Sequence, residues 1–345
     1  MAEPNILLDI STHHKGKYSD KWSLYLDFYW RLFEPIKDSS FDLVEIGVQN
    51  GGSLEIWGKF FKNVTNVVGF DNDPKCANLK FEDSRIKMFI GDASSKETAQ
   101  IVENETTNLG LVIDDGSHKS SDIIRSFLLL FPLLKPGGLY VIEDLHASYW
   151  QSWEGGLSNP DSAMQFLKLL ADVINFDHWG IDAKREDVFE SMLITSDLIK
   201  ESDLSEVGSV TFTDSLCVIR KKESSDYGLG VRVGFGEQAD VEPRATDSHG
   251  TLLIAPSQEL NPLADPKDLS LNRLSALKNQ NQNLQNQNQN LQNQNQDLQN
   301  QKQDLQNQNQ DLKNELTAMR QTLSWKITLP LRKIRNFMSS FAIKG

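Results

Sequence analysis

Acidic residues that could bind a metal ion follow two short apolar runs of the sequence. Asp115 comes just after the run 111–113, and Glu143 and Asp144 follow the run 139–142. If these runs are parallel strands, their carboxyl ends meet at one edge of the sheet, which is where open α/β sheets bind ligands. Three carboxylates in one cleft repel one another unless a cation joins them, and an all-oxygen set suits Mg²⁺ or a similar hard divalent ion. The sequence therefore predicts a divalent-metal site formed by Asp115, Glu143 and Asp144, although solvated turn acids would account for any one of them alone.

A glycine-bearing loop earlier in the chain could bind a cofactor. The segment 45–53 follows the first apolar run and opens a helix, and its glycines let the backbone approach a ligand closely. Its E-x-G-x-x-x-G spacing departs from the G-x-G-x-x-G of dinucleotide dehydrogenases and is typical of S-adenosylmethionine-binding folds. Asp71 ends the next apolar run, where a carboxylate can accept hydrogen bonds from ribose hydroxyls; the alternative is a solvated turn acid. We expect the cofactor to contact six residues: Glu45, Gly47, Gly51, Asp71, Asp92 and Asp114.

The spacing of the apolar runs predicts the fold that brings these residues together. Strand-like runs are separated by segments long enough for crossover helices, such as 53–61 and 120–134. This repetition of strand and helix predicts an α/β fold, with a parallel sheet and helices on both of its faces. Two last runs separated by turn residues predict a hairpin that closes the sheet, so that the first domain spans residues 1–222. The predicted strands are 43–46, 67–70, 87–90, 111–113, 139–142, 208–212 and 215–220.

The sequence after residue 222 predicts two further segments. Residues 223–268 interrupt short apolar runs with glycines and prolines, which indicates an irregular extension and linker. Residues 269–323 repeat a leucine every seven positions, and 25 of the 32 residues from 279 to 310 are Asn or Gln. This composition alone would fit a disordered, prion-like tract, but an unbroken seven-residue period without Gly or Pro favours a parallel α-helical coiled coil and hence a homo-oligomer, dimer or trimer. The repeating leucines are Leu277, Leu284, Leu291, Leu298, Leu305 and Leu312.

Residues 324–345 predict a basic amphipathic tail. From residue 316 onward the chain has six Lys or Arg and no Asp or Glu. This stretch therefore carries +6 and the rest of the chain −19, which together give the formal net charge of −13. Basic amphipathic helices bind anionic membrane surfaces, and a cap on the end of the coiled coil is the alternative. A helix beginning at Pro330 would place Leu331, Ile334, Phe337, Met338 and Phe341 on one apolar face.

Composition disfavours several classes of protein. The formal net charge of −13 argues against a nucleic-acid-binding surface. Cys76 and Cys217 cannot form a disulfide framework and do not lie in a metal-binding Cys/His cluster, which implies a reducing compartment. The N-terminus does not resemble a secretory signal, and the longest apolar run, 127–134, is far shorter than the roughly 20 residues that span a bilayer. We therefore expect a cytoplasmic protein, peripheral on the inner face of the plasma membrane if the tail binds lipid.

The segments 43–54, 113–118 and 141–150 give the chain a resemblance to a known family. From about residue 18 to residue 221 the chain resembles the metal-dependent class I methyltransferases that modify sugar hydroxyls, such as the macrocin and mycinamicin O-methyltransferases. The resemblance implies a Rossmann-like class I methyltransferase sheet and S-adenosylmethionine as cofactor. It also implies roles for four residues: His118 as the general base and Asp115, Glu143 and Asp144 as metal ligands. The tail sequence after 323 is similar to tails that follow coiled coils in bacterial enzymes of surface-polysaccharide assembly.

These roles fit one reaction. A sugar hydroxyl is a poor nucleophile at neutral pH, and a divalent ion lowers its pKa and orients it. An imidazole, with an ordinary pKa near 6.5, can accept the proton while the oxygen attacks the sulfonium methyl group. We therefore expect a metal-dependent O-methyltransferase acting on a glycan, of a surface polysaccharide or a lipid carrier. The alternative is a non-catalytic methyltransferase-like head of an oligomeric membrane scaffold. His146 is open between a substrate contact and a structural role.

Overall fold

The chain forms two compact units, residues 1–276 and 277–345. The computed structural model describes residues 4–190, 192–193, 198–226, 228–261, 264–266 and 270–342. From residue 267 onward it describes the side chains of 282–322, 326–336 and 338. The expected site residues all lie in the first unit.

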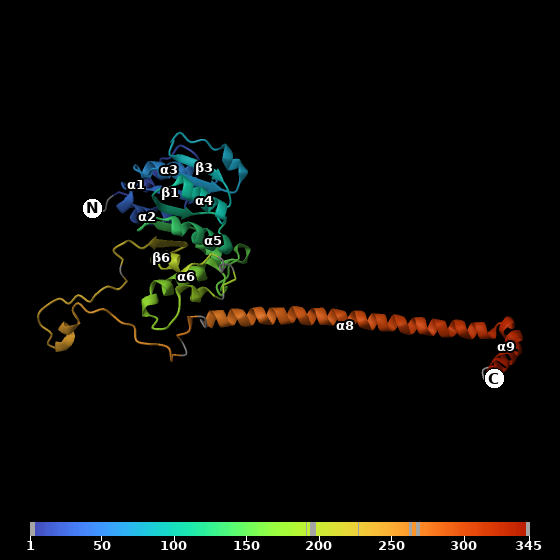
Figure 1. The fold of residues 1–345 in the computed structure, drawn as a ribbon. Coiled ribbons are helices and arrows are strands. Elements are labelled where there is room, and N and C mark those ends of the chain that lie inside the picture. Colours follow the sequence, from blue (N-terminus) through green and yellow to red (C-terminus); the bar gives the residue numbers. More distant parts are fainter. Residues whose placement is uncertain are drawn as a thin grey trace. The chain divides into compact units, whose positions relative to one another are not determined.

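The first unit is built on a seven-stranded sheet (Figure 1) with the strand order β3-β2-β1-β4-β5-β7-β6. The strands β1 to β5 are parallel, whereas β7 is antiparallel to both β5 and β6. The predicted parallel sheet and its closing hairpin are therefore confirmed. The strands are β1 (Asp42–Ile46), β2 (Val67–Asp71), β3 (Ile86–Ile90), β4 (Leu109–Asp114), β5 (Leu139–Ile142), β6 (Val207–Thr213) and β7 (Leu216–Lys221).

Helices cover both faces of the sheet, because alternate residues of the central strands point to opposite sides and both sets are apolar. On one face Val44 and Val112 pack in a core with Phe127 and Phe166. On the other face Leu43 and Leu111 belong to a second core, which also contains Tyr29 and Trp57. The first face is covered by α4 (Lys96–Glu105), α5 (Ser120–Leu130) and α6 (Ala163–Ile174), and the second by α1 (Ile6–Thr12), α2 (Ser23–Phe33) and α3 (Gly52–Phe60).

Short helical turns connect these elements. The α-helix α7 (Glu201–Leu204) precedes β6. Two 3₁₀ turns that follow β5 bear on the site, because they continue directly from its acidic end. The 3₁₀ turns are η1 (Glu34–Ile36), η2 (Pro74–Asn78), η3 (Phe131–Leu133), η4 (Leu145–Tyr149), η5 (Gln151–Trp153), η6 (Phe176–His178), η7 (Arg185–Phe189) and η8 (Pro243–Ser248).

The segment after β7 has little regular structure in its described residues. It contains the turn η8 and a single antiparallel bridge between Val231 and Leu252. Its return toward the α/β fold is marked by a hydrogen bond of 2.7 Å from the Gln258 N–H to the Gly180 carbonyl oxygen. The sequence predicts an irregular extension and linker for this segment, and its role as a linker stays a prediction.

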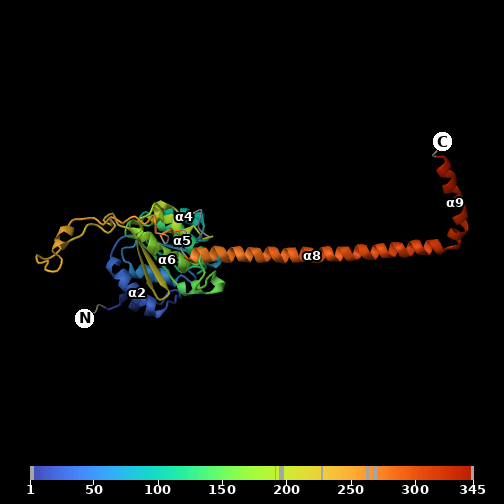
Figure 2. The same cartoon turned by 90° about the horizontal axis from the view of Figure 1, so that it is seen from below.

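The described residues of the second unit form two helices. Most of α8 (Ser270–Gln321) is followed by α9 (Leu323–Ala342), with a bend between them at residue 322 (Figure 2). Gln side chains of α8 donate to Asn side chains four residues later, for example Gln310 to Asn314 at 3.1 Å, which supports the helix locally. Pro330 lies inside α9, so the helix begins seven residues before the predicted start; water can solvate the backbone carbonyl that Pro330 leaves without a donor, because this part of the helix is exposed.

The coiled coil stays a prediction. The described leucines of the repeat, from Leu284 to Leu312, are 56–63% exposed in the single chain. A partner helix in a coiled coil would bury such a row of leucines. The side chains of Leu277 in the predicted repeat, and of Phe337 and Phe341 on the predicted apolar face, lie outside the described residues. Among the described residues, no helix combines the length and apolar character needed to cross a membrane.

Candidate active site

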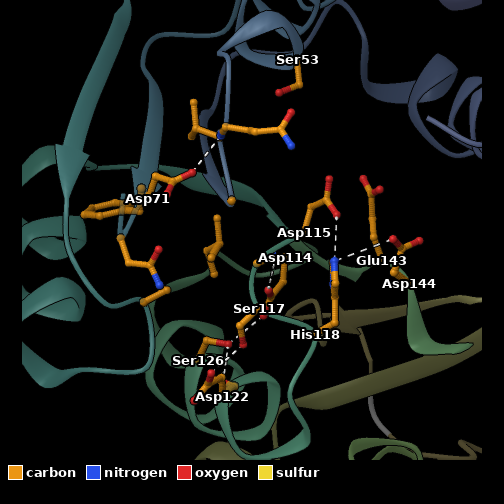
Figure 3. A pocket seen from close by; sticks show the side chains of 18 of the residues that line it. Ser53, Asp71, Asp114, Asp115, Ser117, His118, Asp122, Ser126, Glu143 and Asp144 are labelled. Carbon is orange, nitrogen blue, oxygen red and sulfur yellow. Dashed lines mark hydrogen bonds and ion pairs between the residues drawn. The ribbon is translucent and has the colours of Figure 1, made fainter. Parts of the chain in front are cut away.

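A pocket of about 670 Å³ opens at the carboxyl ends of the parallel strands (Figure 3). Residues that follow β1, β2, β3, β4 and β5 line it, together with the loop before α2. The fold thus gathers most of the predicted site in one cleft, at the edge of the sheet where the topology places ligands. The predicted residues in its lining are Gly47, Asp71, Asp92, Asp114, Asp115, His118, Glu143 and Asp144.

The glycine-bearing loop after β1 forms one end of the pocket. Gly47 has a φ of +83°, and a side chain at this position would meet the Asp115 carbonyl oxygen at 1.9 Å, so glycine is required. The Gln49 N–H donates to Asp71 Oδ2 at 2.8 Å, and the Asp73 N–H donates to Asp71 Oδ1 at 2.8 Å. These bonds fix the Asp71 carboxylate in the pocket wall, and each oxygen keeps a lone pair for a ligand hydroxyl.

Two further acids in the pocket wall differ in how many of their carboxylate oxygens are hydrogen-bonded to the protein. Asp92 Oδ1 accepts hydrogen bonds from the backbone N–H and the hydroxyl of Ser94, at 2.9 and 2.7 Å, and its other oxygen faces no donor among these bonds. Asp114 is buried, and its Oδ2 accepts from Ser126 Oγ at 2.7 Å and from Tyr140 OH at 3.2 Å. Burial raises the pKa of Asp114 to about 6. The Asp114 carboxylate thus bonds mainly to protein groups rather than to a ligand.

The structure places Glu45 and Gly51 beneath the pocket; neither belongs to the described lining. The Glu45 carboxylate is fully buried and accepts from Ser53 Oγ at 2.8 Å and from Trp57 Nε1 at 3.2 Å. Burial raises its pKa to about 7. Gly51, with a φ of +85°, precedes α3 as its N-cap. Both residues therefore shape the loop and anchor α3 from below.

Successive side chains of a strand point to opposite faces of the sheet, and this alternation decides where the acidic side chains at the strand ends point. Glu45, Asp115 and Glu143 continue the face of Leu43, Ile113 and Val141, which is the face that packs against α2 and α3. Asp114 continues the opposite face and meets Ser126 of α5. Three carboxylates from neighbouring strands are thereby directed to the same side of the sheet.

A lysine from the loop before α2 lies among these three carboxylates. Lys21 Nζ donates to Asp115 Oδ2 at 2.5 Å and to Glu143 at 2.9 Å, and the lysine side chain is only 10% exposed. Burial lowers the pKa of Lys21, but the charges of Glu143, Asp115 and Glu45 outweigh it and leave the pKa well above its ordinary value. Glu143 is 2% exposed and also accepts from Tyr29 OH at 2.7 Å. Burial raises the pKa of Glu143, and Lys21 offsets part of that rise.

Asp144 is held from the α2 side and points toward His118. Its Oδ1 accepts from Tyr25 OH at 2.7 Å and from Trp22 Nε1 at 3.1 Å. Its Oδ2 faces His118 Nε2 at 3.7 Å, and Asp115 Oδ1 faces the same nitrogen at 4.0 Å (Figure 3). His118 and Asp144 both have left-handed backbones, with φ of 58° and 53°, a conformation that costs energy and concentrates at functional sites.

The donor set fits a divalent metal ion. Asp115, His118 and Asp144 each offer one ligand atom, and these atoms all lie within 4.8 Å of one another. Each aspartate has one oxygen fixed by protein donors and the other directed into the space beside His118, so two free carboxylate oxygens converge there. The structure thus brings together two of the three predicted ligands and the predicted base, while Glu143 faces Lys21 and Tyr29.

His146 lies at the edge of this cluster. Its Nδ1 is 2.5 Å from Ser215 Oγ in the β6–β7 turn and 3.9 Å from Asp144 Oδ1. Its ring packs edge-on against Trp22 and Trp150, which are both exposed. The contact with Ser215 ties His146 to the β6–β7 turn, and of the two rings beside it Trp22 also lines the pocket.

Sequence reasoning missed the residues that α2 and its preceding loop contribute. Tyr25 and Tyr29 lie one helical turn apart on a buried face and read as core residues, although a buried tyrosine hydroxyl needs a hydrogen-bond partner and so signals a polar group nearby. Lys21 carried no signal of its own, because its partners follow it by 94 and 122 positions.

Comparisons with known proteins agree with this geometry. Residues 44–145 match the family model of a methyltransferase domain. Over 67% of this chain and 58% of the other, the first unit also has the fold of the MycE methyltransferase from the mycinamycin biosynthetic pathway, with a TM-score of 0.52 and 23% sequence identity. The fold is that of a methyltransferase. That MycE structure is a complex with Mg, SAH and mycinamycin VI.

Curated relatives of this methyltransferase fold act on sugars. The chain is 31% identical over 220 residues to the 8-demethyl-8-alpha-L-rhamnosyl tetracenomycin-C 2′-O-methyltransferase of Streptomyces olivaceus, covering 61% of this chain and 54% of the relative. It is 33% identical over 168 residues to the mycinamicin VI 2″-O-methyltransferase of Micromonospora griseorubida, covering 46% and 41%. The chain therefore spans about half the length of the curated relatives it matches, and the predicted resemblance to sugar O-methyltransferases is confirmed.

Proposed function

We propose that the first unit is a metal-dependent O-methyltransferase that transfers a methyl group from S-adenosylmethionine to a sugar hydroxyl. The observation that carries this proposal is the convergence of Asp115, His118 and Asp144 in the same pocket that the Gly47 loop and Asp71 line. The relatives support the acceptor class, because their names describe methylation of sugar hydroxyls, and MycE was seen with Mg and SAH.

The cofactor would lie along the end of the pocket made by β1, β2 and β3. Gly47 lines this end of the pocket, and the Asp71 carboxylate, fixed by two backbone N–H groups, would accept the ribose hydroxyls. Asp92 has an oxygen available for the base or the ribose. Glu45 and Gly51 would act from below by holding the loop and α3 in place.

The acceptor would enter on the side of Asp115 and Asp144, whose free oxygens would hold Mg²⁺ or a similar ion. Such an ion lowers the pKa of a bound hydroxyl and orients it. His118 would take the hydroxyl proton at Nε2; this nitrogen lies 3.7–4.0 Å from the two carboxylate oxygens, so a hydroxyl can be placed between them. Glu143 would act through Lys21 and Tyr29 rather than as a ligand.

Two measurements test this proposal. Calorimetric titration with S-adenosylmethionine, with and without Mg²⁺, should show cofactor binding that changes little with the metal. Formation of S-adenosylhomocysteine in the presence of rhamnosides and other deoxyhexose glycosides should require Mg²⁺ and stop in a chelator. Full turnover in the chelator would contradict the metal-dependent mechanism. Failure to bind cofactor and metal at all would favour the alternative, a non-catalytic head of a scaffold.

We further propose where the enzyme works. The heptad leucines would assemble α8 into a parallel coiled coil, and a 52-residue helix gives a rod of about 80 Å. The exposed apolar and basic residues of α9, such as Ile334 and Arg332, suit an anionic membrane surface. A cytoplasmic homo-oligomer, peripheral on the membrane, would then methylate a lipid-linked or growing surface glycan.

A further inference from the structure

A row of aromatic rings extends from the pocket wall near Asp144. Trp22 lines the pocket, and its ring meets the ring of His146 edge-on, with the centroids 6.3 Å apart. His146 packs in turn against Trp150 at 4.9 Å, and Trp150 packs against Trp153 at 5.5 Å. The last three rings are not among the described lining residues, so this aromatic row continues beyond the pocket.

The rings at the start of the aromatic row are oriented by the protein although they are exposed. Trp22 is 62% exposed and Trp150 is 49% exposed. The Trp22 indole N–H donates to Asp144 Oδ1 at 3.1 Å, and His146 Nδ1 lies 2.5 Å from Ser215 Oγ. Rings that are already oriented lose little conformational entropy when a ligand covers them. The aromatic row is therefore a preformed surface for binding.

The position of the aromatic row favours the acceptor over the cofactor. Gly47 and Asp71, which would contact the cofactor, follow β1 and β2, whereas the row begins beside Asp144, which follows β5. In the sheet β4 separates β5 from β1. A group that binds on the row thus lies on the acceptor side of the site.

The chemistry of the aromatic row suits a sugar ring. The face of an aromatic ring carries partial negative charge, which attracts the C–H groups on the apolar face of a pyranose. Because His146 Nδ1 faces Ser215, its Nε2 is the ring nitrogen that can bond to a sugar hydroxyl. A pyranose offers both an apolar face and hydroxyl groups at its edge. An acyl chain offers only apolar surface and has no group to pair with the imidazole.

We propose that the aromatic row binds the sugar next to the one that is methylated, so that the acceptor is an oligosaccharide or a longer glycan. This inference rests on the proposed function and adds to it the length and composition of the acceptor. The sugar that receives the methyl group lies in the pocket beside Trp22, and its neighbour stacks on Trp150. Trp150 is a specificity-determining residue: it contacts the acceptor but not the hydroxyl that reacts.

Three variants separate stacking from an effect on folding. Trp150→Ala removes the ring, and Trp150→Phe keeps an aromatic face of smaller area. Tyr149→Ala is the matched control, because Tyr149 is the preceding residue, is 42% exposed and makes none of the ring contacts described for the row. Trp22 is left unchanged, since its N–H bonds to Asp144.

The experiment measures saccharide binding to each full-length protein by calorimetry, without cofactor or metal. The probes are methyl glycosides of rhamnose, mannose, glucose and galactose, the di- and trisaccharides of the same sugars, and their 4-nitrophenyl glycosides, which carry a flat apolar ring in place of the second sugar. Wild type should bind at least one di- or trisaccharide about tenfold more tightly than the matching methyl glycoside, the factor expected when about 60 Å² of apolar surface is covered. Trp150→Ala should lose this preference, Trp150→Phe should keep part of it, and Tyr149→Ala should keep all of it.

The outcomes are separable from those of the proposed function, because the measurement needs neither cofactor nor metal. A preference that is lost in Trp150→Ala supports the inference even if no methyl transfer is found. The inference is wrong if wild type binds no saccharide better than the methyl glycosides, if Trp150→Ala binds like wild type, or if the 4-nitrophenyl glycosides bind as tightly as the disaccharides. An altered oligomeric state of Trp150→Ala in ultracentrifugation, with unchanged saccharide binding, would show that the row packs against a second copy of the chain and would also overturn it.

Discussion

Tyr25→Phe tests which carboxylates bind the metal ion. The substitution removes one hydroxyl that donates to Asp144 Oδ1 at 2.7 Å and accepts from the Asp144 N–H at 3.1 Å, and it leaves the aromatic ring in the core. Without these bonds the Asp144 side chain can turn, and its left-handed backbone loses one of the contacts that hold it. We expect the affinity for divalent metal to fall while the affinity for S-adenosylmethionine is unchanged.

The expected loss of metal affinity depends on the hydrogen bonds that Asp144 keeps in Tyr25→Phe. Loss of a hydrogen bond that orients a metal ligand usually lowers metal affinity by about 10–100-fold. Trp22 Nε1 still donates to the same oxygen at 3.1 Å, so the expected loss lies at the lower end, about tenfold or 1.4 kcal/mol. Adding Trp22→Phe should enlarge the loss, but not additively, because both donors act on the same carboxylate.

Tyr29→Phe is the matched control, since it removes the same group one helical turn later on α2. Tyr29 OH donates to Glu143 at 2.7 Å, and both residues are buried. Its loss should cost about 1.5–3 kcal/mol in the free energy of unfolding but change metal affinity by less than about threefold. Mn²⁺ calorimetry and urea unfolding measure the two effects. The reverse pattern, with weak binding in Tyr29→Phe and normal binding in Tyr25→Phe, would show that Glu143 is the ligand and refute the reasoning.

Four other predictions address the base, the buried acid, the coiled coil and the tail. His118→Ala should lower methyl transfer by about 10²–10⁴-fold at constant S-adenosylmethionine affinity, and a small loss in single-turnover assays would remove His118 as the base. Burial raises the pKa of Glu45 from 4.5 to about 7, so the protonated side chain contributes about 3 kcal/mol to the free energy of unfolding below about pH 4.5, and this contribution is lost as the pH rises through 7. Glu45→Gln should therefore flatten the dependence of the unfolding free energy on pH over that range. An unchanged slope would contradict the assignment. Deletion after residue 268 should abolish oligomerisation in ultracentrifugation but keep cofactor binding. Sedimentation with anionic vesicles should be lost in the full-length Ile334→Asp/Met338→Asp variant, and wild-type binding by that variant would instead favour a cap on the coiled coil.

The sheet could be predicted from the sequence because its signals are local. Short apolar runs, crossover-length segments and the two-residue turn before β7 each lie within a few positions, and together they fix the order of the elements. The proximity of Asp115 and His118 is likewise local, since they lie three positions apart in the sequence. To predict that Asp115 and Asp144 lie close together, it was enough to know that the carboxyl ends of parallel strands meet at one edge of the sheet.

The directions of Glu143 and Asp114 could also have been predicted, but only with the period of two applied to the strand ends. Glu143 shares the face of Val141, and Asp114 shares the face of Val112, so these two acids point to opposite sides of the sheet. Asp144 departs from this period, because its backbone is left-handed and its side chain is held by Tyr25 of α2. Lys21 could not have been assigned in this way. Its place depends on how the loop before α2 packs over the sheet, which no local pattern of residues 18–22 encodes.

The amide-rich composition of α8 has a consequence for partner choice. Coiled coils usually select their partners through charged residues that flank the seam and repel mismatched chains. Between residues 279 and 310 this helix has only three charged residues, Asp297, Lys302 and Asp304, and its neighbouring side chains bond to one another as uncharged amides. Assembly through α8 would therefore respond weakly to salt and pH, and it would contain little to reject another chain with the same leucine spacing. A different chain with such a repeat would then join α8 in a mixed bundle about as readily as a second copy of this chain.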